Sequence, residues 1–167
     1  MSTESQNDII QTATVAIFSP DMQRVIMIVN RRLWRILPPW GKFDFRKDWD
    51  IVDTLLREIG EEIRLALFPG TGIFLDYGGK PTNHISPVFI ENFEFIDGSG
   101  SAQDSLFFFR LHDELSWRIL FGETQWFFLS KVELWQEKME RGGRTYELFL
   151  PAEQKSNMKW LITGVMV

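Results

Sequence analysis

The chain has 167 residues, a net charge of −5 at neutral pH, two histidines and no cysteine. Without cysteine, disulfides, cysteine-ligated zinc and thiol catalysis are excluded, and two histidines exclude a histidine-rich metal site. The acidic balance argues against a broad nucleic-acid-binding surface, so we expect no genomic DNA as a partner.

The N-terminal part of the chain predicts a β-hairpin. Residues 1–11 are polar, and we expect a flexible N-terminus there, followed by a single domain over residues 12–167. Residues 12–18 and 24–30 are rich in alternating β-branched and apolar side chains, which is typical of strands. Residues 19–21, Ser-Pro-Asp, supply the turn between them.

A turn containing one glycine is predicted at residues 38–42, and a helix follows it. Asp50 is the expected N-cap of this helix, and Asp53, three residues later, gives a weak capping box. Apolar residues such as Leu55 and Ile59 recur at helical spacing, which predicts an amphipathic helix with one buried face.

The opposite face of this helix carries three carboxylates. Glu58, Glu61 and Glu62 fall at i, i+3 and i+4, so an α-helix places them side by side. Like charges at this spacing repel each other, and a hard divalent cation such as Mg²⁺ or Mn²⁺ would offset the repulsion. The alternative is a solvated acidic face with an ion pair between Arg57 and Glu61.

Residues 57–62, Arg-Glu-Ile-Gly-Glu-Glu, together with Gly41, resemble the Nudix box, whose pattern is G-x5-E-x7-R-E-U-x-E-E-x-G-U with U a bulky apolar residue. The chain departs from this pattern by a two-residue insertion between Gly41 and Arg57. The pattern's late glycine is Arg64, so we expect the helix to continue towards residues 69–70. The first glycine of the usual opening pair is Trp40.

The first glutamate of the Nudix pattern has no clear counterpart in this chain. Trp49 occupies the strict position, and Asp48 and Asp50 are the two stand-ins. The sequence does not choose between them.

The remaining elements fit the Nudix fold. Strands are expected at residues 88–96, 106–111 and 126–129, with a flexible connection at residues 97–101. A capping box at residues 130–133 opens a helix that is expected to end near the glycine pair 142–143, and a short last helix follows Pro151. This order is compatible with the fold that the resemblance implies, which is α/β: a Nudix α/β/α sandwich with a mixed central sheet.

The resemblance implies a metal site and a catalytic site. It implies metal ligands on one helix face and at the preceding turn, where a backbone carbonyl would contribute: Glu58, Glu61, Glu62, and Trp40 or Gly41. Arg57 would orient the carboxylates. The general base would be Glu58 or, on a later loop, Glu123, which is equally well explained as an ordinary loop acid.

Substrate-binding residues are expected among basic and aromatic loop residues. Lys42 and Arg46 lie in the loop on the metal side, and Arg31 is a further basic candidate. The tryptophans in predicted loops are candidates for stacking on a base, and the sequence does not choose among them: Trp34, Trp40, Trp49 and Trp117. The loop at residues 76–87 is either a substrate loop or a plain connection.

The resemblance therefore implies a Mg²⁺- or Mn²⁺-dependent hydrolase that cleaves a diphosphate linkage in a nucleoside diphosphate joined to another group. That group could be a nucleotide, a sugar, a second nucleoside or a capped RNA end. The alternative is a catalytically weak or inactive Nudix-fold module that binds a nucleotide. No apolar run spans a membrane and no signal sequence is evident, so we expect a cytoplasmic protein without membrane association. The sequence leaves open whether the protein forms a homodimer.

Overall fold

The computed structural model describes residues 9–30, 34–63, 72–95, 98, 100–112, 126–148 and 158–167. The strands are Ile10–Phe18 (β1), Arg24–Asn30 (β2), Arg35–Leu37 (β3), Trp40–Lys42 (β4), Gly72–Leu75 (β5), Phe89–Glu94 (β6), Ser101–Leu111 (β7), Trp126–Ser130 (β8), Lys138–Arg141 (β9) and Arg144–Leu148 (β10). The helices are Ile51–Ile63 (α1), Lys131–Leu134 (α2) and Met158–Val165 (α3).

These strands form one ten-stranded mixed sheet. Its main path runs β5-β7-β1-β2-β3-β10-β9, while β4 pairs with β1, β6 with β7 and β8 with β2. The β1–β7 and β3–β10 pairs are parallel and the other pairs are antiparallel. The parallel pairing of β7 with β1 joins segments that lie about ninety residues apart, through the register Thr12 to Asp104. The mixed sheet predicted from the sequence is confirmed.

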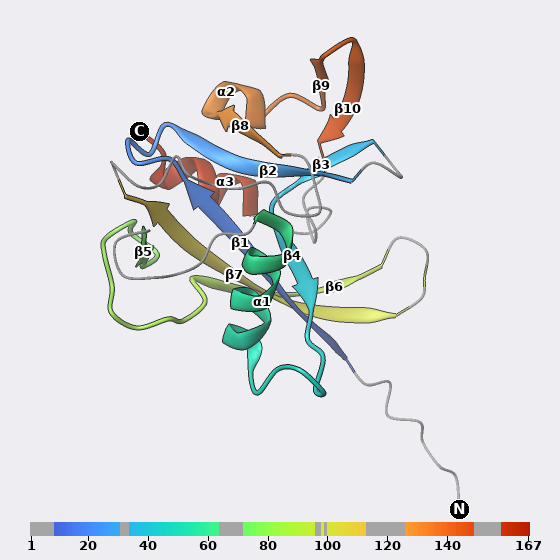
Figure 1. Cartoon of the computed structure of the whole chain (residues 1–167), viewed down its shortest axis with the longest axis vertical. Coiled ribbons are helices and arrows are strands. Elements are labelled where there is room, and N and C mark those ends of the chain that lie inside the picture. The colour runs from blue at the N-terminus through green and yellow to red at the C-terminus, as the bar shows by residue number, and fades with distance from the viewer. Residues whose placement is uncertain are drawn as a thin grey trace, which may run out of the picture.

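Helices cover both faces of this sheet, as Figure 1 shows for α1 and α3 on either side of β1. Side chains alternate along a strand, so neighbouring residues enter opposite layers. Val15 and Phe107 pack beneath the apolar stripe of α1, whose Leu55 and Ile59 are buried as predicted. The α/β/α layering follows from this alternation.

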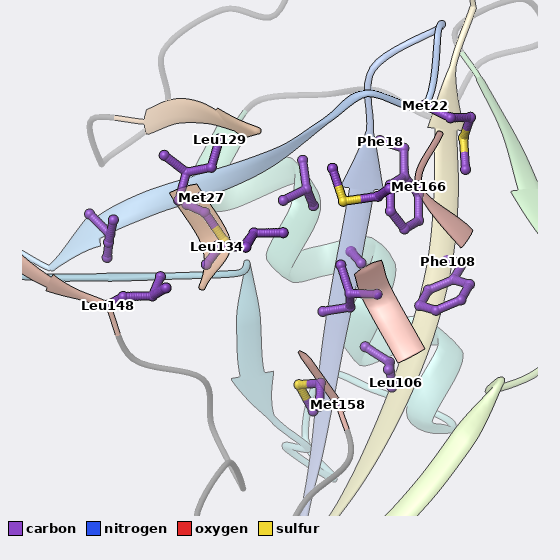
Figure 2. Close-up of a cluster of buried hydrophobic side chains, with 14 of the residues drawn as sticks. Phe18, Met22, Met27, Leu106, Phe108, Leu129, Leu134, Leu148, Met158 and Met166 are labelled. Atoms are coloured by element: carbon purple, nitrogen blue, oxygen red, sulfur yellow. The ribbon is translucent and has the colours of Figure 1, made fainter. Parts of the chain in front are cut away.

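The second layer is the larger apolar cluster, drawn in Figure 2. Met158 and Met166, at the two ends of the C-terminal helical segment, lie among Phe18, Leu106 and Phe108 of the sheet. The rings of Phe18 and Phe108 meet edge to face, with centroids 5.3 Å apart. Burial of each such side chain contributes about 1.5–3 kcal/mol, so this layer fixes α3 on the face opposite α1.

Helix α1 begins where the sequence predicts. The Asp53 backbone N–H donates to Asp50 Oδ1 at 3.0 Å, and the Trp49 backbone N–H donates to Asp53 Oδ2 at 2.9 Å. The first of these bonds satisfies an amide group that a helix start leaves without an intrahelical partner, and the second ties the residue before the cap to the first turn. The predicted N-cap is confirmed, whereas the expected continuation of the helix towards residues 69–70 lies outside the described residues.

The segment after residue 130 differs from the prediction. The capping box is present, because Glu133 N donates to Ser130 Oγ and Ser130 N donates to Glu133 Oε1. However, α2 ends at Leu134, and residues 138–148 form the β9–β10 hairpin instead of a long helix. Gly142 and Gly143 both have positive φ, so the glycine pair makes the two-residue turn of a hairpin and does not end a helix.

Three further boundaries differ. β1 begins at Ile10, inside the stretch expected to be a flexible N-terminus. β7 begins at Ser101, five residues before the predicted strand, because its polar first half pairs with β1 and β6. Residues 40–42 form the strand β4 and not a turn. None of the helices within the described residues is long and apolar enough to cross a membrane.

Candidate metal and catalytic site

Arg57 is the centre of a charged cluster on α1. Its Nε donates to Asp48 Oδ1 at 2.9 Å and its Nη2 donates to Asp48 Oδ2 at 2.8 Å, so the guanidinium and the carboxylate form two parallel hydrogen bonds. The same Nη2 donates to the Lys42 backbone oxygen at 3.1 Å. Arg57 Nη1 contacts Glu58 Oε1 at 2.8 Å and Glu61 Oε2 at 3.6 Å. Arg57 thus links the loop, β4 and the acidic face of the helix.

Of the two stand-ins for the pattern's first glutamate, Asp48 is the one that contacts Arg57. The Asp48 side chain is 1% exposed and accepts further hydrogen bonds from Thr54 Oγ1 at 2.9 Å and from the Asp44 backbone N–H at 3.0 Å. The hydrogen bonds and charge of Arg57 hold the pKa of Asp48 well below its usual range. The other stand-in, Asp50, caps α1, and Trp49 is 94% exposed.

Gly41 is required by a close approach and not by a turn. Its φ is not positive, and a Cβ placed on it would lie 2.0 Å from Glu58 Cδ and Oε1. The Glu58 side chain therefore packs directly over the backbone of β4. The turn predicted at residues 38–42 is wrong at the glycine itself, because residues 40–42 are extended and pair with β1.

Glu58 lies in a partly desolvated position. Burial raises its pKa, the neighbouring charge of Glu61 acts in the same direction, and Arg57 opposes both. A carboxylate whose pKa is raised holds a proton more readily than an exposed glutamate does, which is the property required of a general base.

The three carboxylates of the acidic face fit a divalent cation in kind. Glu58, Glu61 and Glu62 offer oxygen ligands from one side of α1, as Mg²⁺ and Mn²⁺ prefer. In the arrangement described, Arg57 draws Glu58 and Glu61 towards itself, and no group of three acidic or histidine side chains among the described residues converges as a metal site. The side chains of Glu58 and Glu61 would have to turn from Arg57 to share an ion.

The predicted substrate residues are not brought to one place. The Lys42 Nζ lies 5.4 Å from the centre of the Phe95 ring, and the Arg46 guanidinium lies over Phe45. Trp34 is 40% exposed and stacks against Arg144 of β10, 4.0 Å from the ring centre. Trp34 therefore makes its contacts in the part of the sheet formed by β3 and β10.

Three predicted residues, Arg31, Trp117 and Glu123, lie outside the described residues. Whether Trp40 or Gly41 offers a carbonyl oxygen to a metal also stays a prediction. The reasoning from sequence missed Thr54 as a support of Asp48, although a threonine three residues before Arg57 on the same helix was a signal for it.

A mixed sheet between α1 on one face and α3 on the other, with an Arg-Glu-x-x-Glu-Glu helix packed over a glycine strand, is the Nudix fold. The fold predicted from the sequence is confirmed by solved structures. No protein-family model matches the sequence, and no curated protein matches it.

Three solved structures carry the comparison. A Clostridium perfringens hydrolase of the NUDIX family matches with a TM-score of 0.56 and 13% identity, over 93% of this chain and 92% of that one. A Caenorhabditis elegans Ap4A hydrolase in a binary complex matches with 0.58 and 11%, over 92% and 93%. The NUDIX domain of Shewanella oneidensis NrtR, complexed with ADP ribose, matches with 0.53 and 13%, over 79% of each chain. At these sequence identities, the similarity shows a shared fold and nothing further.

Proposed function

We propose that this protein is a Nudix-type hydrolase, dependent on Mg²⁺ or Mn²⁺, that cleaves the diphosphate linkage of a nucleoside diphosphate joined to another group. The observation that carries the proposal is the position of Glu58. This carboxylate packs over Gly41, is held by Arg57 at 2.8 Å and has a raised pKa, on the same helix face as Glu61 and Glu62.

In this proposal each residue of the site has one task. Glu58, Glu61 and Glu62 would hold the metal ion, which when bound would neutralise phosphate charge and stabilise the leaving phosphate. Arg57 orients Glu58, and Asp48 orients Arg57 from behind through two hydrogen bonds. Glu58 would accept the proton of the attacking water, unless Glu123 supplies that function.

Two of the structurally similar proteins support the substrate class. One is an Ap4A hydrolase and the other was complexed with ADP ribose, and both compounds contain a diphosphate linkage attached to adenosine. We therefore propose a small nucleoside diphosphate derivative as the partner of this site. A capped RNA end, a homodimer and a cytoplasmic location stay predictions from the sequence.

A second candidate function is a nucleotide-binding or regulatory module that does not cleave its ligand. The observation that favours it is the engagement of Glu58 and Glu61 by Arg57, at 2.8 and 3.6 Å, in place of a convergent carboxylate group. The complete carboxylate set opposes it, because a pure binder has no need to keep three like charges on one helix face.

The test is a hydrolysis screen of the purified protein with Mg²⁺ or Mn²⁺. The panel contains nucleoside triphosphates, ADP ribose, nucleotide sugars, dinucleoside polyphosphates and capped RNA, with the products identified by chromatography. We expect cleavage of at least one compound, and we expect the double variant Glu61→Gln/Glu62→Gln to lower kcat at least about 100-fold because it loses charged metal ligands.

The matched control is Glu137→Gln/Glu140→Gln, which removes two exposed glutamates beside and on β9. It should retain wild-type turnover and the same far-ultraviolet circular dichroism spectrum. Equal turnover in all three proteins would rule out the assignment of the metal ligands. Tight binding without any product on the whole panel would instead support the binding module.

A further inference from the structure

A second pair of carboxyl groups lies in the sheet, away from the acidic face of α1. Asp104 of β7 is 1% exposed, and its Oδ1 accepts hydrogen bonds from Thr12 Oγ1 at 2.6 Å and from Thr14 Oγ1 at 2.8 Å. Glu91 of β6 is the direct cross-strand neighbour of Asp104, and its side chain is half-buried. The two threonines of β1 therefore fix one oxygen of a buried acid beside a second acid.

Two oxygens of this pair receive no hydrogen bond from the described residues, and one of them, Glu91 Oε2, is buried. The other is Asp104 Oδ2. Within the same residues no hydrogen bond joins the two carboxyl groups. Leaving a buried carboxylate oxygen without a donor is costly, and such a group calls for a missing partner.

Burial raises the pKa of Asp104 to about 6, and the charge of Glu91 makes a smaller contribution in the same direction. A ligand that donates two hydrogen bonds would remove the strain at neutral pH. A pair of N–H groups suits two carboxylate oxygens, because each bond is charge-assisted.

This pair lies on β7 and β6, which β1 separates from β4, and on the sheet face opposite α1. The register aligns Glu91, Asp104, Thr12 and Lys42 across four neighbouring strands, so these residues share one face of the sheet. Lys42 connects the two sites, because its backbone oxygen accepts from Arg57 while its ammonium group reaches Phe95.

The pair is also close to the edge of the sheet. Among the described strands β6 pairs only with β7, so Glu91 lies on an edge strand and is partly exposed. Phe93, two residues further along the same face of β6, contacts Phe95 edge to face and supplies an apolar wall on which a planar ring could stack.

We propose that Asp104 and Glu91 bind the base of the substrate, and that this base is a guanine-type purine. The proposal rests on the proposed function. Among the four common bases, guanine alone presents two adjacent donors, N1–H and the 2-amino group, on its pairing edge, where enzymes read an unpaired base. Adenine and cytosine place a ring acceptor beside their amino group, which would meet the carboxylate oxygens unfavourably.

The test measures binding of nucleotides that cannot be cleaved. Isothermal titration calorimetry with Mg²⁺ at pH 7.5 compares the α,β-methylene analogues of GDP, IDP and ADP. The inosine compound differs from the guanosine compound only by the 2-amino group. We expect the guanosine compound to bind about 10-fold or more tightly than either of the other two. The loss of one hydrogen bond to a charged group lowers the affinity by about this factor.

Two variants and one control test the residues. Asp104→Asn keeps an oxygen for the two threonines and adds a donor, and Glu91→Gln does the same at the partly exposed edge. Each should reduce the guanosine-to-adenosine preference about 10-fold. Glu94→Gln, an exposed glutamate three residues along β6 from Glu91, should leave the preference unchanged. Circular dichroism establishes that each variant is folded.

The outcomes separate this proposal from the proposed function. Equal binding of the three analogues, or an unchanged preference in Asp104→Asn and Glu91→Gln, would overturn the base assignment even if the hydrolysis screen succeeds. Guanosine-selective binding without any hydrolysis would support the base site while removing the proposed enzyme. Binding that depends on the ribose hydroxyls and not on the base would also overturn it, because ribose is common to all three analogues.

Discussion

At the scale of single residues, Gly41 shows how little space the candidate site contains. The Glu58 carboxylate occupies the volume where any other residue would place its Cβ, with 2.0 Å between that position and Glu58 Cδ. Gly60, two residues after Glu58 in α1, has nothing within 4 Å of the corresponding position. A side chain at position 41 would therefore overlap Glu58, whereas a side chain at position 60 would meet open space.

Gly41→Ala should displace the Glu58 side chain. We expect the variant to lose about 1–3 kcal/mol in the free energy of unfolding through overpacking, and to lose more than about 10-fold in kcat. Urea denaturation and the hydrolysis assay measure the two effects.

Gly60→Ala is the matched control, because alanine favours a helix interior. Its free energy of unfolding should rise by about 0.5–1 kcal/mol, and its activity should be unchanged. Equal behaviour of the two alanine variants would contradict the close packing of Glu58 on β4.

At the scale of elements, the connection between β4 and α1 is held by Asp48. The loop contributes this buried acid to Arg57, and Thr54 of the first helical turns supports it. The two-residue insertion relative to the Nudix pattern is accommodated in this loop without loss of the acid–arginine pair.

Asp48→Asn removes the charge that faces Arg57. We expect the free energy of unfolding to fall by roughly 2 kcal/mol, since the arginine keeps only a neutral partner and part of its charge is desolvated. Asp50→Asn is the control from the same loop, and it should change the free energy by less than about 0.5 kcal/mol because asparagine caps a helix as well as aspartate does. If chemical denaturation gives equal losses for both, Asp48 has no special role.

The elements also show where a local pattern misleads. Residues 130–133 form the predicted capping box, but the helix that follows has one turn. The sequence from 138 to 148 carries a glycine pair that fits both a helix end and a hairpin turn. The hairpin prevails because Met139, Tyr146 and Leu148 become buried against the sheet, which a helix on the same segment would not achieve.

At the scale of the whole molecule, the β1–β7 pairing buries Asp104, and stability should depend on pH as a result. The folded pKa of about 6 lies above the ordinary value of 3.8, so the folded state binds the proton more strongly than the unfolded state. The protein should therefore lose stability as pH rises from about 4 to about 6, by about 3 kcal/mol from this group.

Asp104→Asn isolates this effect from the other titrating groups, including the neighbouring Glu91. We expect urea denaturation between pH 4 and pH 7.5 to show that the free energy of unfolding of the variant rises relative to that of the wild type as pH rises, by up to about 3 kcal/mol. Curves that stay parallel across this range would show that Asp104 titrates normally.

The sequence by itself determined the features that depend on local spacing. The order of the first strands and α1, the N-cap at Asp50 and the shared face of Glu58, Glu61 and Glu62 follow from periods of two and 3.6 residues. The Nudix fold is predicted from the resemblance of Gly41 and residues 57–62 to the Nudix box. Only the tertiary structure selected Asp48 over Asp50, placed Glu58 on Gly41, and paired the polar start of β7 with β1. Those relations join residues that are distant or ambiguous in sequence, and contact across the sheet is what decides them.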